Sequence, residues 1–515
     1  MFPFMLMMRF FKQIKWLLFT KKISGKQCLI TACRIFLFFF SFSSSAQFKN
    51  TVWCFGDSAG IDFNDTANIT TFSSGMDSRG SCVSIADSSG ALLFYAYTRG
   101  ANNVNSCTVR NKQHQIMENG DNMIGENWYS ELIILPISGQ PNRFYLFSLL
   151  ALSPYGLYYS IIDINENAGL GKVVERDIQI GTDRMWDAMA ALKHANGRDY
   201  WLITKDWNNP NGDNVFHIDL ITPDSIIRST QAIGYIQFGN LGVMTFSKDG
   251  NKFLFTTYNG MAEVLDFNRC TGQFSNPVKL ANAWAQYRKL GSAFSPDGSK
   301  AYIARADTNS WLYQYDLNAS NPQSSQTTIT TIIRPIEAGG SLRLAPDNKI
   351  YWSCAWTNQI TTNFPYQDTM YHPENMNLSV INSPNSLGAA CDLSMYSFYL
   401  GGKRTYWGLP NNPNYSLGPV TSSICDTLTG IEHPQENVTL CSITPNPNNG
   451  NFILQYNGIN EKAEIDIFDI TGKLLLHEKI YSNKTEFNLS SVPSGLYVIV
   501  VTTEKFRWHS KIVKQ

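Results

Sequence analysis

The sequence lacks the residue patterns of the common metal-dependent and nucleotide-binding enzymes. It contains no H-E-x-x-H motif and no glycine-rich phosphate loop, and no two of its ten cysteines are spaced as C-x-x-C. The seven histidines are scattered along the chain without a metal-ligand spacing. We therefore predict neither a metal site nor a cofactor.

Basic charge is also scarce beyond the N-terminus. The 515 residues include 41 Lys and Arg and 41 Asp and Glu. Because residues 1–46 hold seven of the basic residues and no acidic one, the remainder has 41 − 7 = 34 basic and 41 acidic groups, a net charge of −7. An acidic chain without a basic stripe argues against nucleic-acid binding.

Long helical periodicities are missing as well, and short strands with tight turns take their place. Ser295-Pro296-Asp297-Gly298 has the residues of a type I turn and lies between two apolar runs. Similar turns follow Phe246 and Leu344, at spacings from Phe294 of 294 − 246 = 48 and 344 − 294 = 50 residues. A repeat of this length made of short strands is typical of a β-propeller blade.

Three weaker copies of the turn lie upstream, and the six copies have a mean period of (344 − 85)/5, about 52 residues. Residues 47–411 have room for seven such units. We therefore predict an all-β, WD-repeat-like, seven-bladed β-propeller. Its seventh blade is expected to combine strands from both ends, with Trp53–Phe63 pairing with strands after Leu378.

The N-terminus has the features of a signal peptide. Lysines precede an apolar run centred on Ile35–Phe40, and small residues follow it up to a signal-peptidase site between Ala46 and Gln47. The alternative is a membrane anchor, but Arg34 leaves the run shorter than the ~20 apolar residues that span a bilayer. We predict that residues 1–46 are removed and that the mature chain has no transmembrane span.

Eight cysteines remain after such a cleavage. An exported protein meets oxidising conditions, so some of them are expected to form disulfides. Spacing leaves the connectivity open, and the sequence-local guesses are Cys82–Cys107, Cys354–Cys391 and Cys425–Cys441.

Blade geometry indicates where a ligand would bind. The repeated turn ends the first strand of each blade, so the loops between second and third strands and the connectors between blades share the opposite face. These segments are rich in Trp and Arg, which are typical contact residues on a rigid scaffold, although the tryptophans could instead pack between blades. The candidate ligand-binding residues are Trp186, Asp187, Trp207, Trp284, Tyr287, Arg288, Arg334, Glu337 and Trp356.

The C-terminal part of the chain is predicted to be a linker and a second domain. Residues 412–435 are rich in Asn, Pro, Ser and Gly without clear periodicity, which is typical of a linker. Residues 436–515 alternate between apolar and polar side chains, with frequent turns. This pattern predicts a small Ig-like β-sandwich.

Several stretches of residues 47–411 resemble a family of secreted propeller proteins from bacteria that use the type IX secretion system. They include Trp53–Phe63, His114–Gly120 and Gly340–Asp347, and together they cover most of 51–411. The resemblance implies the propeller fold and no defined activity.

Residues 436–515 closely resemble the type A C-terminal sorting domain of the same secretion system. The resemblance implies binding to the type IX secretion machinery and transport from the periplasm across the outer membrane. It also implies that the domain is usually removed afterwards, which leaves the cargo on the cell surface or released. The residues that carry the motifs are Pro445, Asn446, Pro447, Gly450, Gly472, Gly495, Tyr497 and Lys511.

Together these features predict an exported surface or extracellular binding module with a glycan or a protein as its ligand. The alternative is a secreted enzyme acting on polysaccharide. A glycosidase needs two carboxyl groups across the scissile bond, and the predicted loop face offers Asp187, Asp206 and Glu337 without a visible pairing. We therefore favour binding over catalysis.

Overall fold

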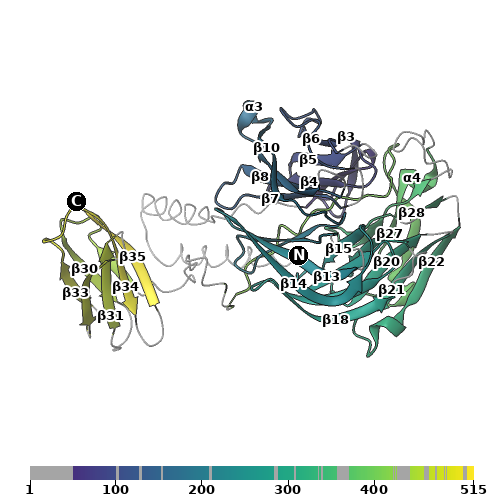
Figure 1. Ribbon diagram of the computed structural model, residues 1–515. Helices are drawn as coiled ribbons and strands as arrows, with labels where there is room; N and C mark the ends of the chain where they lie inside the picture. The colour runs from purple at the N-terminus through teal and green to yellow at the C-terminus, as the bar shows by residue number, and fades with distance from the viewer. Residues whose placement is uncertain are drawn as a thin grey trace, which may run out of the picture. The chain divides into compact units, whose positions relative to one another are not determined.

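The chain divides into two compact units, residues 1–429 and 430–515, in the computed structural model (Figure 1). The structure describes residues 50–99, 104–126, 130–151, 155–207, 212–282, 288–306, 309–333, 336–337, 340–356, 371–421, 423, 425, 441–456, 463–469, 473–480, 482, 484–502 and 507–515. The predicted signal peptide with its cleavage site, and residues 426–440, lie outside these ranges.

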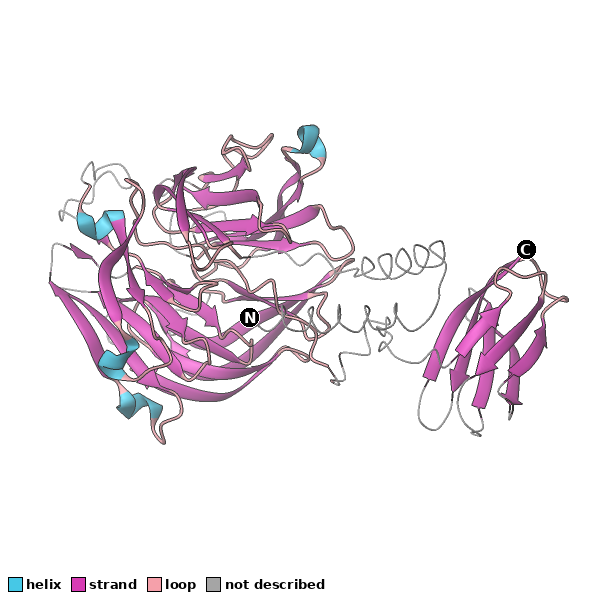
Figure 2. Cartoon of the chain, turned by 180° about the vertical axis from the view of Figure 1, so that it is seen from behind, coloured by secondary structure: helices cyan, strands magenta, loops and turns pink. Residues whose placement is uncertain are grey.

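Strands dominate both units (Figure 2). The helices of the described residues are single turns, and none of them could cross a bilayer. They are α3 (Glu166–Gly169), η1 (Pro322–Ser325), α4 (Pro373–Met376) and η2 (Gly388–Cys391).

Seven antiparallel sheets of three or four strands follow one another through the described part of the first unit, which confirms the predicted propeller. Sheet 1 contains β1 (Val52–Phe55), β2 (Asp57–Asp62) and β3 (Thr70–Asp77), and sheet 2 contains β4 (Cys82–Ala86), β5 (Leu92–Thr98) and β6 (Cys107–Asn111). Sheet 3 contains β7 (Leu132–Pro136), β8 (Arg143–Leu150), β9 (Gly156–Asp163) and β10 (Lys172–Gly181). Sheets 4 and 5 contain β11 (Ala190–Lys193), β12 (Tyr200–Thr204), β13 (Asp213–Ile221) and β14 (Ile226–Gln237), then β15 (Gly242–Phe246), β16 (Lys252–Thr257), β17 (Ala262–Asn268) and β18 (Gln273–Ala281).

The last two sheets of the propeller follow the same order. Sheet 6 contains β19 (Arg288–Phe294), β20 (Lys300–Ala306), β21 (Asn309–Asp316) and β22 (Thr327–Ile333), and sheet 7 contains β24 (Leu342–Leu344), β25 (Ile350–Trp352), β27 (Asn377–Ile381) and β28 (Leu393–Tyr399). A separate pair, β23 (Ile336–Glu337) and β26 (Ala355–Trp356), flanks β24 and β25 in the sequence.

All six predicted copies of the repeat join the first strand to the second strand, in sheets 2 to 7. In sheet 6 the Gly298 N–H donates to the Ser295 carbonyl at 2.9 Å, and the Ser295 hydroxyl lies 2.6 Å from an Asp297 carboxylate oxygen. Gly298 has a φ of +69°, which a residue without Cβ adopts at little cost. The turn therefore forms from its own four residues, which is why the sequence predicted it.

The first strands of the sheets lie innermost. They contact one another in the pairs β1–β4, β4–β7, β11–β15, β15–β19 and β19–β24. Every residue of β7 and of β12 is buried, whereas most of β14, an outermost strand, is exposed or partly exposed. Apolar runs thus form the interior of the ring and polar strands its rim, where an unpaired edge meets water.

The ring closes by packing between sheet 1 and sheet 7. The Tyr351 ring lies edge-on to Trp53 and Phe63, with ring centroids 6.0 and 5.4 Å apart. The prediction of a blade built from strands of both chain ends is wrong, because β1, β2 and β3 form sheet 1 by themselves. Within the described residues, the Asp57–Arg404 pair is the one backbone bridge from sheet 1 to the chain after Leu378. A local hairpin closes a far shorter loop than pairing across more than ~300 residues, so it costs less chain entropy.

Residues 404–421, 423 and 425, which we call the crossing segment, follow sheet 7 and pack against several other sheets. Tyr415 shows how deeply the segment is inserted, because its side chain is buried in the core of sheets 2 to 4. In chain order the segment hydrogen-bonds to Ser341 beside sheet 7, Cys82 of sheet 2, Ile134 of sheet 3, Arg269 after β17 of sheet 5 and Ala195 after β11 of sheet 4.

The crossing segment changes the domain boundary expected from the sequence. We predicted a linker from residue 412, but the chain packs against the propeller as far as Cys425, which forms a disulfide with Cys270. The guessed Cys425–Cys441 pair is therefore wrong, because the crossing segment carries Cys425 to a turn 155 residues away in the sequence. The other described cysteines, including the remaining guessed pairs, are buried free thiols.

The second unit is a β-sandwich, as predicted. Its apolar side chains, among them Phe452, Ile465 and Ile499, form one core. One sheet has the order β29 (Cys441–Thr444), β30 (Asn451–Tyr456), β33 (Lys484–Asn488), and the other has the order β32 (Leu474–Ile480), β31 (Ala463–Asp469), β34 (Gly495–Thr502), β35 (Arg507–Lys514).

Candidate functional site

Two of the predicted loop segments lie side by side at one edge of sheet 4. The chain enters β11 through Met185–Asp187 and leaves β12 through Asp206-Trp207. Met185 and Asp206 form an antiparallel bridge, and the Trp207 N–H donates to the Arg184 carbonyl at 2.5 Å. The connector before the first strand and the loop after the second strand therefore meet, as the directions of the strands predicted.

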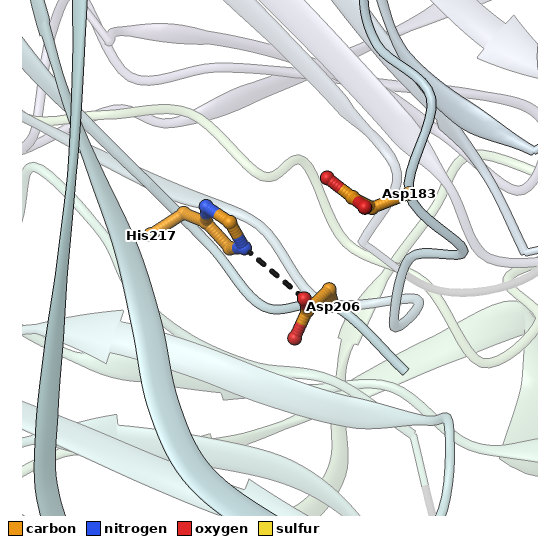
Figure 3. A group of neighbouring side chains, drawn as sticks. All are labelled: Asp183, Asp206 and His217. Atoms are coloured by element: carbon orange, nitrogen blue, oxygen red, sulfur yellow. Dashed lines mark ion pairs between the residues drawn. The ribbon is translucent and has the colours of Figure 1, made fainter. Parts of the chain in front are cut away.

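A triad of Asp183, Asp206 and His217 lies at this edge (Figure 3). One carboxylate oxygen of each aspartate and one ring nitrogen of the histidine lie within 4.8 Å of one another, and all three residues are partly buried. His217 Nε2 is 3.5 Å from Asp206 Oδ2. Asp183 precedes β11, Asp206 follows β12, and His217 belongs to β13 opposite Thr204, so the β12–β13 hairpin positions two of the three side chains.

Aromatic and basic side chains flank the triad. The Arg184 guanidinium lies 3.5 Å from the centroid of the Trp207 ring and 5.2 Å from that of Tyr155, and its Nε donates to the Ala151 carbonyl at 3.3 Å. Trp207 and Arg184 are partly buried, and Tyr155 is exposed. The stack of Tyr155, Arg184 and Trp207 thus gives the loop face a partly exposed aromatic surface with one fixed positive charge.

Two of the predicted contact residues are buried instead. The Trp186 side chain is 2% exposed and lies in the core between sheets 4 and 5, with its ring centroid 5.7 Å from that of Phe255. Asp187 is also 2% exposed and accepts a hydrogen bond from the Ser130 N–H at 2.9 Å. Their positions fit packing and loop support, and neither side chain faces solvent in this structure.

The other predicted contact residues carry no geometric argument. Trp284, Tyr287 and Arg334 lie outside the described part of the chain. The other three residues belong to described strands, but their side chains are not among the described ones. These three are Arg288 in β19, Glu337 in β23 and Trp356 in β26. Their contribution to ligand binding stays a prediction.

Buried charges lie behind the triad. Lys205, whose side chain is fully buried, forms an ion pair with Asp213 and lies 5.7 Å from the Trp186 ring centroid. Burial raises the pKa of Glu263 to about 7, although its carboxylate accepts hydrogen bonds from the Gln237 amide and a backbone N–H. Perturbed carboxyl groups beside an open face are common at functional sites, but they also occur in structural networks.

Sequence reasoning named Asp206 and missed Asp183 and His217 as its neighbours. The spacings are 206 − 183 = 23 and 217 − 206 = 11 residues, which match no metal motif. The signal that could have found His217 is the β12–β13 register, because a hairpin brings the end of one strand close to the start of the next.

One further peptide has the letters of a hydrolase motif. Gly56-Asp57-Ser58-Ala59-Gly60 matches G-x-S-x-G, and Ser58 has a φ of +61°. The peptide lies in the hairpin between β1 and β2, whereas the nucleophile motif requires a strand-to-helix turn. The Ser58 hydroxyl is 3.3 Å from an oxygen of Asp57, which is itself paired with Arg404, so this geometry offers no general base to the serine.

The predicted sorting residues have distinct structural roles in the second unit. The Asn446 side chain donates to the Lys511 carbonyl at 2.6 Å and accepts from the Val513 N–H at 2.8 Å, which holds the last strand against the entry loop. The Tyr497 hydroxyl donates to the Pro493 carbonyl at 2.5 Å. Gly450, with φ +107°, packs against the Ser490 backbone. Gly495 begins β34, and the Lys511 side chain is exposed. Gly472 lies outside the described residues.

Comparison with known protein families identifies the second unit. Residues 442–515 match the family described as "Secretion system C-terminal sorting domain". The chain therefore ends in a sorting domain of the type IX secretion system, and this domain implies export across the outer membrane to the surface or the medium. No curated protein sequence gives a significant match.

Solved structures similar to the chain are β-propellers of low sequence identity. A putative 6-phosphogluconolactonase from Bacteroides fragilis NCTC 9343 is 11% identical, with a TM-score of 0.43, over 72% of this chain and 98% of that one. A second, from Bacteroides uniformis ATCC 8492, is 11% identical, with a TM-score of 0.39, over 60% and 88%. Kluyveromyces lactis Hsv2 is 11% identical, with a TM-score of 0.33, over 64% and 93%. Likeness at this level says nothing about activity.

Proposed function

We propose that this chain, which ends in a secretion-system sorting domain, is a ligand-binding propeller that acts on the cell surface or in the medium. The observation that carries the proposal is the stack of Tyr155, Arg184 and Trp207 beside the polar triad. A partly exposed aromatic surface with oriented polar groups suits stacking on sugar rings or on protein side chains.

Rigid support favours binding at this edge. The backbone bridge between Met185 and Asp206 and the hydrogen bond from Trp207 to Arg184 hold the two loops together. A surface that is already ordered before a ligand arrives loses less conformational entropy on binding.

The proposal is tested on a glycan and protein array with residues 47–515, the chain without its predicted signal peptide, and the Trp207→Ala variant of it. We expect wild-type protein to bind a defined subset of ligands, and the variant to bind them about tenfold or more weakly, since truncation of a contact aromatic costs about 1–2 kcal/mol or more. Equal binding by both proteins, or no binding by wild type, would contradict the proposal. Release of shortened glycans from the same array would instead support the alternative enzyme.

A further inference from the structure

The spacing of the Asp183–Asp206–His217 triad fits a metal ion better than a direct hydrogen bond. His217 Nε2 and Asp206 Oδ2 are 3.5 Å apart, longer than the ~2.7–3.2 Å of an N–H···O hydrogen bond. Two ligands that each lie ~2.0–2.1 Å from a tetrahedral zinc ion are about 3.4 Å apart. The pair therefore has nearly the separation that a shared ion would impose, and the Asp183 carboxylate completes the set within 4.8 Å.

The histidine supplies a second observation. His217 Nε2 is itself buried, points toward Asp206 (Figure 3), and has no hydrogen-bond partner among the described residues. A buried polar atom without a partner costs about 1–3 kcal/mol. Coordination through the Nε2 lone pair would remove this cost and would explain why the ring is turned into the triad.

Two cations near the triad have carboxylate partners outside it. Lys205 is paired with Asp213, and Arg228 is paired with Asp219, with Nε 3.3 Å from the carboxylate. The Arg184 guanidinium flanks the triad and is stacked on the Trp207 ring. Asp183 and Asp206 bring two carboxylates to the same edge, and carboxylate oxygens are ligands for a divalent cation.

Arg228 also faces the other side of the imidazole. Its Nη2 is 3.5 Å from His217 Nδ1, a long hydrogen bond in which the guanidinium can only donate. Metal binding through Nε2 places the ring proton on Nδ1, so zinc binding requires this long hydrogen bond to be lost. The ion pair of Arg228 with Asp219 and its hydrogen bond to the Ile180 carbonyl, at 3.2 Å, hold the guanidinium without it.

We propose that Asp183, Asp206 and His217 bind one zinc ion, through one oxygen of each carboxylate and through Nε2. One imidazole with two carboxylates suits zinc, whereas calcium and magnesium prefer oxygen ligands alone. Three protein ligands leave a fourth position open for water or for a group of a bound ligand. The inference goes beyond the proposed binding function, because it concerns a cation and needs no knowledge of the ligand.

The test is a calorimetric titration of chelator-treated protein, residues 47–515 without the predicted signal peptide, with zinc chloride. We expect one zinc ion per chain and no comparable binding of calcium or magnesium. Asp206→Asn, Asp183→Asn and His217→Gln keep the size of the side chains but remove a ligand, and each is expected to weaken zinc binding about 10- to 100-fold or more. Far-ultraviolet circular dichroism verifies the fold of each variant, and if one fails to fold, the others decide.

A matched control comes from the second unit. His477 Nδ1 lies 2.6 Å from Asp466 Oδ1, so the two residues form an exposed His–Asp pair without a third ligand. His477→Gln should leave the zinc affinity unchanged. Absence of zinc binding by wild-type protein, or equal binding by the folded triad variants and wild type, would overturn the proposal.

Discussion

Cys270, in the turn after β17, is bonded to Cys425, at the end of the described crossing segment, across 155 residues. The bond therefore joins a segment that starts beside sheet 7 to sheet 5. Arg269, the neighbour of Cys270, donates to the Gly418 carbonyl at 2.7 Å, so the attachment includes more than the two sulfur atoms. Among the described residues, no strand of sheet 1 pairs with a strand of sheet 7, so the crossing segment and its disulfide add a second link across the ring.

Removal of the disulfide should destabilise the propeller. A cross-link over a loop of this length restricts the unfolded chain, and its loss is expected to cost about 2–5 kcal/mol. We expect Cys270→Ser, Cys425→Ser and the double variant to unfold at similar, lower temperatures than wild type in thermal melts. Dithiothreitol should lower the melting temperature of wild type and leave that of the variants unchanged. An equal response of all four proteins would contradict a stabilising role of this disulfide.

Asn411 should be essential for anchoring the crossing segment. Its side-chain oxygen accepts from Arg343 Nη2 at 2.8 Å, and its amide donates to the Leu132 and Met189 carbonyls at 3.3 and 3.0 Å. Burial lowers the pKa of Arg343 to about 10. Asn411→Ala is expected to cost about 2–4 kcal/mol, since it removes the acceptor of a partly buried charge and leaves two buried carbonyls without their donor.

Urea unfolding of the Asn411→Ala variant gives that free energy directly. Asn414→Ala is the matched control, because Asn414 belongs to the same segment but donates one partly exposed hydrogen bond, at 2.9 Å, to the Lys248 carbonyl. The control should change stability by less than about 1 kcal/mol. Similar losses for both variants would mean that Asn411 has no special anchoring role.

Trp186 and Trp207 should respond in opposite ways to truncation. The buried Trp186→Ala leaves a large cavity and is expected to cost about 3–5 kcal/mol of stability. Trp207→Ala removes a partly exposed ring stacked on Arg184 and should cost only about 1 kcal/mol. Thermal melts compare the two variants. If Trp207→Ala lowers the melting temperature as much as Trp186→Ala does, Trp207 is a core residue and the proposed aromatic binding surface is wrong.

Glu263 should make stability depend on pH. Its carboxyl pKa is raised by burial to about 7, above about 4.3 in an unfolded chain. The folded state therefore holds the proton more tightly, so this contribution is full below about pH 4 and is lost as the pH rises to about 7. The unfolding free energy of Glu263→Gln, relative to wild type, is expected to rise by about 3 kcal/mol between pH 4.5 and 7.5; a constant difference would argue against a raised pKa.

Deletion of residues 436–515 should stop export. The truncated chain keeps the predicted signal peptide and the propeller but lacks the sorting domain at 442–515. We expect it to accumulate in the periplasm, whereas the full chain reaches the surface or the medium. Cell fractionation and surface labelling measure the distribution, and normal surface display of the truncated chain would refute the assignment of the export route.

The sequence by itself determined the elements that depend on neighbouring residues. Ser295–Gly298 forms its turn from its own hydroxyl, carboxylate and glycine, and the other five copies of the turn appear where the repeat predicted them. The alternating strands of the second unit likewise predicted a sandwich, and the motifs of 436–515 predicted the sorting domain. Local hydrogen bonding and side-chain periodicity carry this information, so it can be read without a partner strand.

Only the tertiary structure decided which distant residues meet. The path of the crossing segment, the Cys270–Cys425 bond and the separate sheet 1 each depend on packing between elements far apart in the chain. Asp183 and His217 join Asp206 for the same reason, because a connector and a hairpin meet at one edge of sheet 4. Polar composition predicted a linker from residue 412, but the propeller accepts the first of these residues because the Asn412 amide and the Tyr415 hydroxyl find hydrogen-bond partners there.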